Sequence, residues 1–182
     1  MSLLLLNANA LSIPLADQSV QCVVTSPPYW GLRDYGIGGQ LGLEQTPAEY
    51  VENMVQVFRE VWRVLRDDGT CWVNLGDSYA SGMRSAYDDD RHKYATARAY
   101  DKRPPTPFGL KPKDLIGIPW RVAFALQADG WYLRSAPPWI KGNCMPESVK
   151  DRFTVSHEYW FFLTKKARYY FDADAIRTPH KE

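Results

Sequence analysis

A short β-branched run that ends in two prolines constrains the fold of this chain more than any other feature. Residues 20–24 read Val-Gln-Cys-Val-Val and predict a buried β-strand. Pro27 and Pro28 stop the strand, because proline lacks a backbone N–H and fixes φ, and Pro27 also keeps Ser26 extended. Ser26 and Tyr29 are therefore expected at the carboxyl end of a sheet, where open α/β folds bind ligands.

The loop that follows this strand suits a planar amino group. The Ser26 hydroxyl and the backbone carbonyl of Pro27 can each accept a hydrogen bond from such a group. Accepting both protons would draw the nitrogen towards a tetrahedral geometry and free its lone pair for attack. Tyr29 offers an aromatic face on which a heterocycle can stack. The alternative is an ordinary strand-to-loop turn, in which Pro-Pro is common.

Residues 25–29 resemble the catalytic motif of the amino-methylating DNA methyltransferases, written Asp/Asn/Ser-Pro-Pro-Tyr. These enzymes transfer a methyl group from S-adenosyl-L-methionine to the exocyclic nitrogen of adenine or cytosine in double-stranded DNA. The serine form is more typical of N4-cytosine enzymes, so Ser26 favours cytosine over adenine. The resemblance implies a catalytic set and a set that contacts substrate or DNA. The first comprises Ser26, Pro27, Pro28 and Tyr29, and the second comprises Trp30, Arg33 and Lys141.

Other parts of the chain are similar to the same family. Residues 3–6 predict a strand, and residues 7–20 look like the lead-in Gly-Asp-x-Leu … Leu-Pro-Asp-x-Ser-Val-Asp. Most of the chain matches apart from about residues 80–112. The implied fold is α/β, a partial Rossmann-like methyltransferase sheet with flanking helices and an antiparallel edge hairpin. Further similar segments are 65–74, 139–141, 145–148 and 157–162.

Two asparagines are candidates for cofactor binding. Asn9 stands where the family usually has an aspartate that reaches the cofactor's adenine, and asparagine can both donate and accept. Asn74 lies at the carboxyl end of a second predicted strand, residues 70–75, and so near the pocket. The alternatives are an Asn-rich turn at Asn9 and a loop cap at Asn74.

One family motif is not found. The glycine-rich motif Asp-Pro-Phe-x-Gly-Ser-Gly-Thr, through which the family binds S-adenosyl-L-methionine, does not occur in the sequence. In the circularly permuted beta order the catalytic motif comes first, the target-recognition region next and the glycine-rich motif last. Residues 1–182 are therefore predicted to be a single, incomplete catalytic domain that needs a missing C-terminal half or a second chain.

Local signals predict the remaining elements. Thr46-Pro47-Ala48-Glu49 is a capping box that opens an amphipathic helix to about residue 66. A second helix is predicted over residues 113–128, and a strand over 131–140 in which Pro137 and Pro138 imply an edge, a bulge or a loop. Residues 159–163 and 168–171 are expected to form the hairpin. Residues 31–45 are predicted to be a glycine-rich mobile loop.

Charge is unevenly distributed along the chain. Residues 1–79 hold 4 Lys and Arg against 9 Asp and Glu, net −5, whereas residues 80–182 hold 18 against 12, net +6. A basic half suggests a polyanionic partner, although a solvated surface of mixed charge is the alternative. Residues 78–112 read as a loop-like insertion whose interleaved basic and aromatic residues suit DNA, while the three consecutive aspartates at 88–90 oppose contact with phosphate.

Several other classes are disfavoured. Three scattered histidines and three cysteines without a CxxC pair predict no metal site, and Cys22 and Cys71 are expected to be reduced thiols in core strands of a cytoplasmic protein. No apolar run is long enough for a membrane span. A hydrolase triad of Ser26 with His157 and Glu158 lacks the Gly-x-Ser-x-Gly turn. The remaining alternatives are an inactive DNA-binding fragment and a methyltransferase for RNA or a protein amide.

Overall fold

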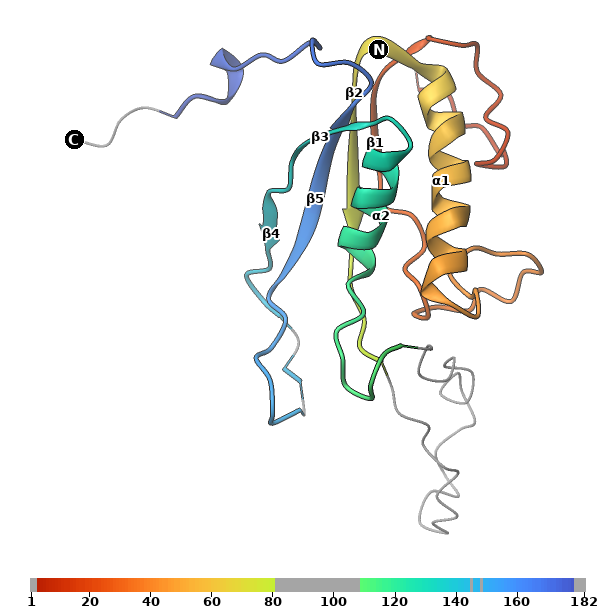
Figure 1. The fold of residues 1–182 in the computed structure, drawn as a ribbon. Coiled ribbons are helices and arrows are strands. Elements are labelled where there is room, and N and C mark those ends of the chain that lie inside the picture. The colour runs from red at the N-terminus through yellow and green to blue at the C-terminus, as the bar shows by residue number, and fades with distance from the viewer. Residues whose placement is uncertain (1–2, 81–108, 145, 148, 179–182) are drawn as a thin grey trace.

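The computed structural model describes residues 3–80, 109–144, 146–147 and 149–178. Its elements follow one another as strands and helices around a single five-stranded sheet (Figure 1). The three aspartates at 88–90 and most of the predicted insertion 78–112 lie outside the described residues. The elements are β1 (Val20–Thr25), α1 (Pro47–Val64), β2 (Leu65–Leu75), α2 (Ile118–Ala128), β3 (Tyr132–Ser135), β4 (Pro138–Ile140), β5 (His157–Thr164) and the 3₁₀ turn η3 (Asp174–Ile176).

The sheet is mixed, with the order β1-β2-β5-β3. β1 and β2 run parallel, and β5 runs antiparallel to β2. β3 and β4 both pair with the outer side of β5 and are separated by Ala136 and Pro137. The predicted α/β class is confirmed and the proline break falls in an edge strand, as expected. The predicted hairpin is wrong, because β5 lies inside the sheet and residues 168–171 form no strand.

α1 begins as the sequence indicates and ends earlier. The Thr46 hydroxyl accepts from the Glu49 N–H at 3.2 Å while the Glu49 carboxylate accepts from the Thr46 N–H, which completes the capping box. The predicted end at about residue 66 is two residues late, since Leu65 is already extended, with φ −71° and ψ 137°. β2 therefore starts directly from the helix. Tertiary pairing overrides the local helical pattern here, because Leu65 pairs with Val20 of β1.

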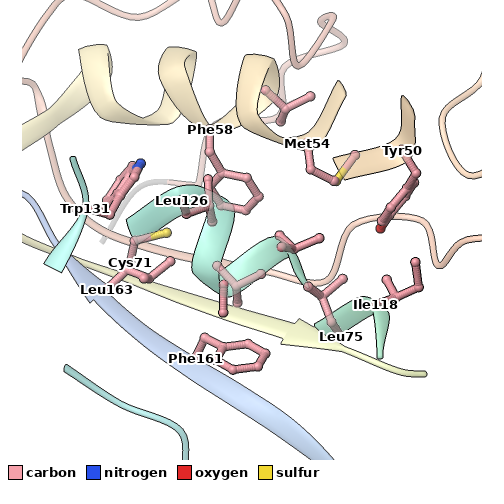
Figure 2. Packing of buried hydrophobic residues seen from close by; sticks show 14 of the residues in the cluster. Tyr50, Met54, Phe58, Cys71, Leu75, Ile118, Leu126, Trp131, Phe161 and Leu163 are labelled. Carbon is pink, nitrogen blue, oxygen red and sulfur yellow. The ribbon is translucent and has the colours of Figure 1, made fainter. Parts of the chain in front are cut away.

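The core lies between the two helices and one face of the sheet (Figure 2). Alternate residues of β2, among them Cys71 and Leu75, point to this face and are fully buried, as a period of two requires. Phe161 and Leu163 of β5 continue the same layer. The helices supply the opposite wall, with Tyr50, Met54 and Phe58 from α1 and Ile118 and Leu126 from α2.

Three further expectations fail, all of them about burial or the extent of an element. The predicted buried strand is only partly buried: Val20 and Val23 of β1 pack against the core, but no residue of β1 is fully buried, and Cys22 is an exposed thiol and not a core residue. Residues 3–6, predicted as a strand, form none, and their leucines are exposed. Residues 113–117 precede α2 as an irregular turn, in which Lys113 has φ +76°. A sequence pattern indicates which residues are apolar, but these residues are buried only where another part of the chain packs against them.

Candidate functional site

The carboxyl ends of the two parallel strands bring the proline loop and Asn74 together. Thr25 pairs with Val73 in the parallel strands, so the residues that follow β1 and β2 lie together at the carboxyl ends of these strands. The Tyr29 hydroxyl donates to the Asn74 side-chain oxygen at 2.8 Å, and the Asn74 NH₂ donates to the Tyr159 carbonyl at 3.1 Å. Asn74 is only 8% exposed. Its buried amide is thus satisfied on both sides and links β1, β2 and β5.

Two close contacts fix the shape of the loop. The Tyr29 ring lies against the backbone of Gly76, where an added Cβ would be 2.5 Å from Tyr29 Cε2. The buried Tyr50 of α1 donates its hydroxyl to the Pro28 carbonyl at 2.8 Å. The first contact requires glycine at residue 76, and the second occupies the Pro28 carbonyl. The loop is therefore held from β2 on one side and from α1 on the other.

Two hydrogen-bond acceptors remain open next to this held aromatic ring. Ser26 is exposed, and its hydroxyl makes only long contacts, 3.4 Å to the Tyr29 hydroxyl and 3.5 Å to the Asn74 side-chain oxygen. Within the described ranges no hydrogen bond reaches the Pro27 carbonyl. Ser26 Oγ and the Pro27 oxygen belong to adjacent residues of a rigid segment. They are suited to accept the two protons of one amino group.

Glu158 of β5 adds a negative charge behind the tyrosine. Its carboxylate lies 3.2 Å from the Tyr29 hydroxyl and also forms an ion pair with Lys141, the residue after β4. Burial raises the pKa of the Tyr29 phenol above its usual value; the hydrogen bond with Ser26 opposes this effect and the Glu158 charge adds to it. Tyr29 therefore keeps its proton at neutral pH and acts as a hydrogen-bond donor.

The structure brings together six of the predicted site residues and places three elsewhere. Ser26, Pro27, Pro28, Tyr29, Asn74 and Lys141 lie in or beside this network. Asn9 closes an exposed turn, where its side-chain oxygen accepts from the Leu11 N–H at 3.0 Å. Arg33 lies in the exposed loop, where its carbonyl accepts from Gln40 at 2.9 Å.

Trp30 occupies an environment that differs from the predicted one. Its side chain is 4% exposed and belongs to the hydrophobic core. Its indole N–H donates to the Glu44 carbonyl at 3.0 Å. These surroundings favour a role in anchoring the loop over the predicted contact with substrate or DNA.

Three residues of the site were not identified from the sequence. Glu158 lies in the family-like segment 157–162 and in the disfavoured triad, but neither pattern predicts its contact with Tyr29, which is 129 residues away in the sequence. Tyr50 falls within the predicted helix and Gly76 just after the predicted strand 70–75, and nothing in the local pattern marks either as part of a site. β5 runs antiparallel to β2, so the first residues of β5 lie beside the last residues of β2. Glu158 is the second residue of β5, and its position at the start of a strand is therefore the one sequence signal that points to the site.

Two broader observations concern metals and membranes. Among the described residues, no group of three or more His, Cys, Asp or Glu side chains could hold a metal ion. No helix in the same part of the chain is long and apolar enough to cross a membrane.

The fold and the site together define an α/β protein with a rigid polar loop at the carboxyl ends of two parallel strands. Residues 20–182 match the family model N6_N4_Mtase, described as DNA methylase. The chain belongs to this family, which confirms the resemblance read from the proline motif.

Known relatives and solved structures agree with this assignment. The chain is 59% identical over 166 residues to the Type II methyltransferase M.SmaI of Serratia marcescens, covering 91% of this chain and 56% of the relative. It is 58% identical over 175 residues to M.Cfr9I of Citrobacter freundii, covering 95% and 58%. Its fold resembles that of the PvuII DNA methyltransferase (cytosine-N4-specific), with a TM-score of 0.60 at 18% identity over 90% of this chain and 48% of that one. The chain thus spans little more than half the length of the curated relatives it matches.

Proposed function

We propose that this chain is the acceptor-binding part of a site-specific DNA methyltransferase. The enzyme would move a methyl group from S-adenosyl-L-methionine to the exocyclic amine of a base flipped out of double-stranded DNA. The observation that carries the proposal is the pair of open acceptors, Ser26 Oγ and the Pro27 carbonyl, beside the fixed ring of Tyr29. Family membership and Type II relatives support DNA as the substrate and a restriction–modification context.

The chain's own residues would position the acceptor nitrogen. The Ser26 hydroxyl and the Pro27 carbonyl would each accept a hydrogen bond from one of its two N–H groups. The nitrogen lone pair would then point away from the loop, towards the methyl donor. The base would stack on the Tyr29 ring, which packs closely against Gly76. Tyr50 holds the Pro28 carbonyl and Asn74 holds the Tyr29 hydroxyl, so the loop and the ring are both fixed in place. Positioning of this kind can lower the activation barrier substantially in a reaction that has no covalent intermediate.

The described residues fit the acceptor more fully than the donor. S-adenosyl-L-methionine supplies a methyl group attached to a positively charged sulfur. Of the two predicted cofactor residues, Asn74 already uses both ends of its amide within the protein, and the Asn9 oxygen is used within its own turn. Asn74 therefore fits a positioning role.

Cytosine is the favoured base within this proposal. The serine of the motif favours N4-cytosine, and one structural neighbour is itself described as cytosine-N4-specific. Adenine N6 is the alternative. The basic residues Arg33 and Lys141 would face the DNA backbone, although Lys141 is also engaged by Glu158. The cytoplasmic location follows from the same proposal, and all three cysteines are free thiols.

Two measurements test the proposal. Calorimetric titration of the chain with S-adenosyl-L-methionine reports donor binding, with and without the part of M.SmaI that lies outside the matched region. Transfer of a labelled methyl group to DNA, followed by nucleoside analysis, should give N4-methylcytosine. Label in N6-methyladenine would redirect the proposal to the other amine. Label only in RNA or in a protein amide, or a Ser26→Ala variant with full activity, would overturn it.

A further inference from the structure

Among the described residues, the most exposed large hydrophobic side chain lies in a loop beside the candidate site. Phe153 is 96% exposed, in the segment of residues 141–156 that joins β4 to β5. A single apolar side chain on a protein surface is ordinary, so this exposure has no meaning by itself. The contacts of the residues on both sides of Phe153 distinguish it from other exposed side chains.

Glu147 closes the loop around this ring. One of its carboxylate oxygens pairs with Arg152 at 2.6 Å, immediately before Phe153, and the other accepts from the Val155 N–H at 3.2 Å, after it. The side chains of Glu147 and Arg152 are each only 27% exposed. One carboxylate thus connects the chain before and after Phe153, and the ring projects from a closed loop into solvent.

The same loop is fastened to the chain that follows β2. The Arg152 guanidinium lies over the Tyr79 ring, 3.7 Å from its centre, and Asp151 pairs with Lys113 at 2.6 Å. Tyr79 comes shortly after Gly76, the residue against which the aromatic ring of the site packs. The exposed ring of Phe153 is therefore carried by a loop that is tied to the candidate site.

The loop also leads directly into the site along the chain. It ends at β5, whose second residue, Glu158, lies 3.2 Å from the Tyr29 hydroxyl. Figure 1 shows this loop and the chain after β2 at the same end of the sheet. A duplex that presents a base to Ser26 would approach this end and meet the loop.

We propose that Phe153 enters the base stack of the DNA duplex and fills the space that the target base leaves when it turns into the site. A base that leaves the duplex loses its stacking and pairing, and an apolar side chain inserted in its place regains contact with the neighbouring bases. Phenylalanine suits this position because its ring is flat and has no hydrogen-bonding group to leave unpaired. The inference rests on the proposed function and adds a residue for extraction of the base to those that hold its amine.

A cation on the same loop supports DNA as the partner. Lys150 is exposed, and within the described part of the chain no acidic side chain pairs with it. Lysines in such positions contact phosphates and fix the register of a protein on the duplex. Lys150 would therefore hold the backbone next to the step that Phe153 enters.

The test compares two duplexes that hold the target base with different strength. The first contains one target site, chosen from the positions that the wild-type protein methylates, and the second lacks the base opposite the target. Phe153→Ala should lower the rate of methyl transfer at least tenfold on the paired duplex. On the second duplex the loss should be less than threefold, because the target base has no pairing partner to leave. Phe153→Leu keeps a bulky apolar side chain and should stay within threefold of wild type on both.

Phe124→Ala is the matched control. Phe124 is 55% exposed on α2, and its removal should change transfer less than threefold on both duplexes. Thermal unfolding of each variant reports the fold, and Phe153→Ala should leave the unfolding temperature unchanged because its ring is almost fully exposed in the free protein.

The possible failures are distinguishable. Equal losses on the two duplexes would show that Phe153 acts on the transfer step and would overturn the inference while the proposed function stands. A wild-type rate in Phe153→Ala would do the same, and a changed sedimentation coefficient in that variant would assign the ring to contact between protein chains. No methyl transfer to DNA by the wild-type protein would remove the inference together with the proposed function.

Discussion

The hydroxyl of Tyr29 donates to the side-chain oxygen of Asn74 at 2.8 Å, across 45 residues of sequence. This bond joins the loop after β1 to the end of β2, and both groups are at least partly buried. The Asn74 NH₂ donates to the Tyr159 carbonyl of β5. The loop is therefore connected by hydrogen bonds to both β2 and β5, which restricts its movement. Ser26 is thereby placed without making a strong bond of its own.

Tyr29→Phe should loosen the site while leaving the fold intact. The variant removes the donor to Asn74, whose oxygen is then left without its strongest partner at a cost of about 1–3 kcal/mol. Methyl transfer by the assembled enzyme should fall through kcat. Urea denaturation gives the stability change, and single-turnover transfer gives the chemical step. Tyr170→Phe, at an exposed tyrosine, is the control and should change neither; equal behaviour of the two variants would contradict the positioning role.

Gly76→Ala should displace the Tyr29 ring. The new Cβ would meet Tyr29 Cε2 at 2.5 Å, a distance at which one of the two must move. Because Asn74 and Tyr50 hold the surrounding loop, we expect loss of transfer to exceed loss of stability. Gly142→Ala is the matched control, since nothing lies within 4 Å of its added Cβ. Wild-type transfer rates in Gly76→Ala would show that the ring's position is unimportant.

Glu158→Gln should lower the pKa of Tyr29. Burial is the main cause of the raised Tyr29 pKa, and the negative charge of Glu158 raises it further. Glutamine has nearly the same shape as glutamate but carries no charge, so the substitution removes only this second contribution. NMR titration of ¹³Cζ-labelled tyrosine follows the ionisation directly. The Tyr29 signal would be assigned by its absence in Tyr29→Phe. An unchanged or higher pKa in Glu158→Gln would mean that the two side chains do not interact as the structure indicates.

The success of sequence-based prediction here follows the range of the interactions involved. The capping box at Thr46 and the proline break between β3 and β4 are local, and both were predicted correctly. The position of β5 inside the sheet and the incomplete burial of β1 depend on which segments pair at long range, and neither can be predicted from local patterns. The same holds for the site. The proline motif located Ser26 and Tyr29, but Glu158 reaches them only through the pairing of β2 with β5.

Tyr50→Phe should have a pH-dependent effect on stability. At neutral pH it removes the buried hydrogen bond to the Pro28 carbonyl, at a cost of about 1–2 kcal/mol. Burial, followed by the nearby charge of Glu44, raises the pKa of Tyr50 well above its ordinary value of 10.0. Above pH 10 the unfolded chain releases this proton while the folded chain keeps it, so the folded state binds more protons and its stability falls as the pH rises.

The variant lacks this group, so its own stability falls less steeply, by up to about 1.4 kcal/mol per pH unit for one proton. The stability difference between wild type and Tyr50→Phe should therefore be largest near pH 8 and shrink between pH 10 and 11. Urea denaturation at these pH values measures it. Tyr132→Phe, at an exposed tyrosine, should leave the difference near zero throughout. A difference for Tyr50→Phe that stays constant from pH 8 to 11 would show that the folded protein does not hold this proton more tightly than the unfolded chain.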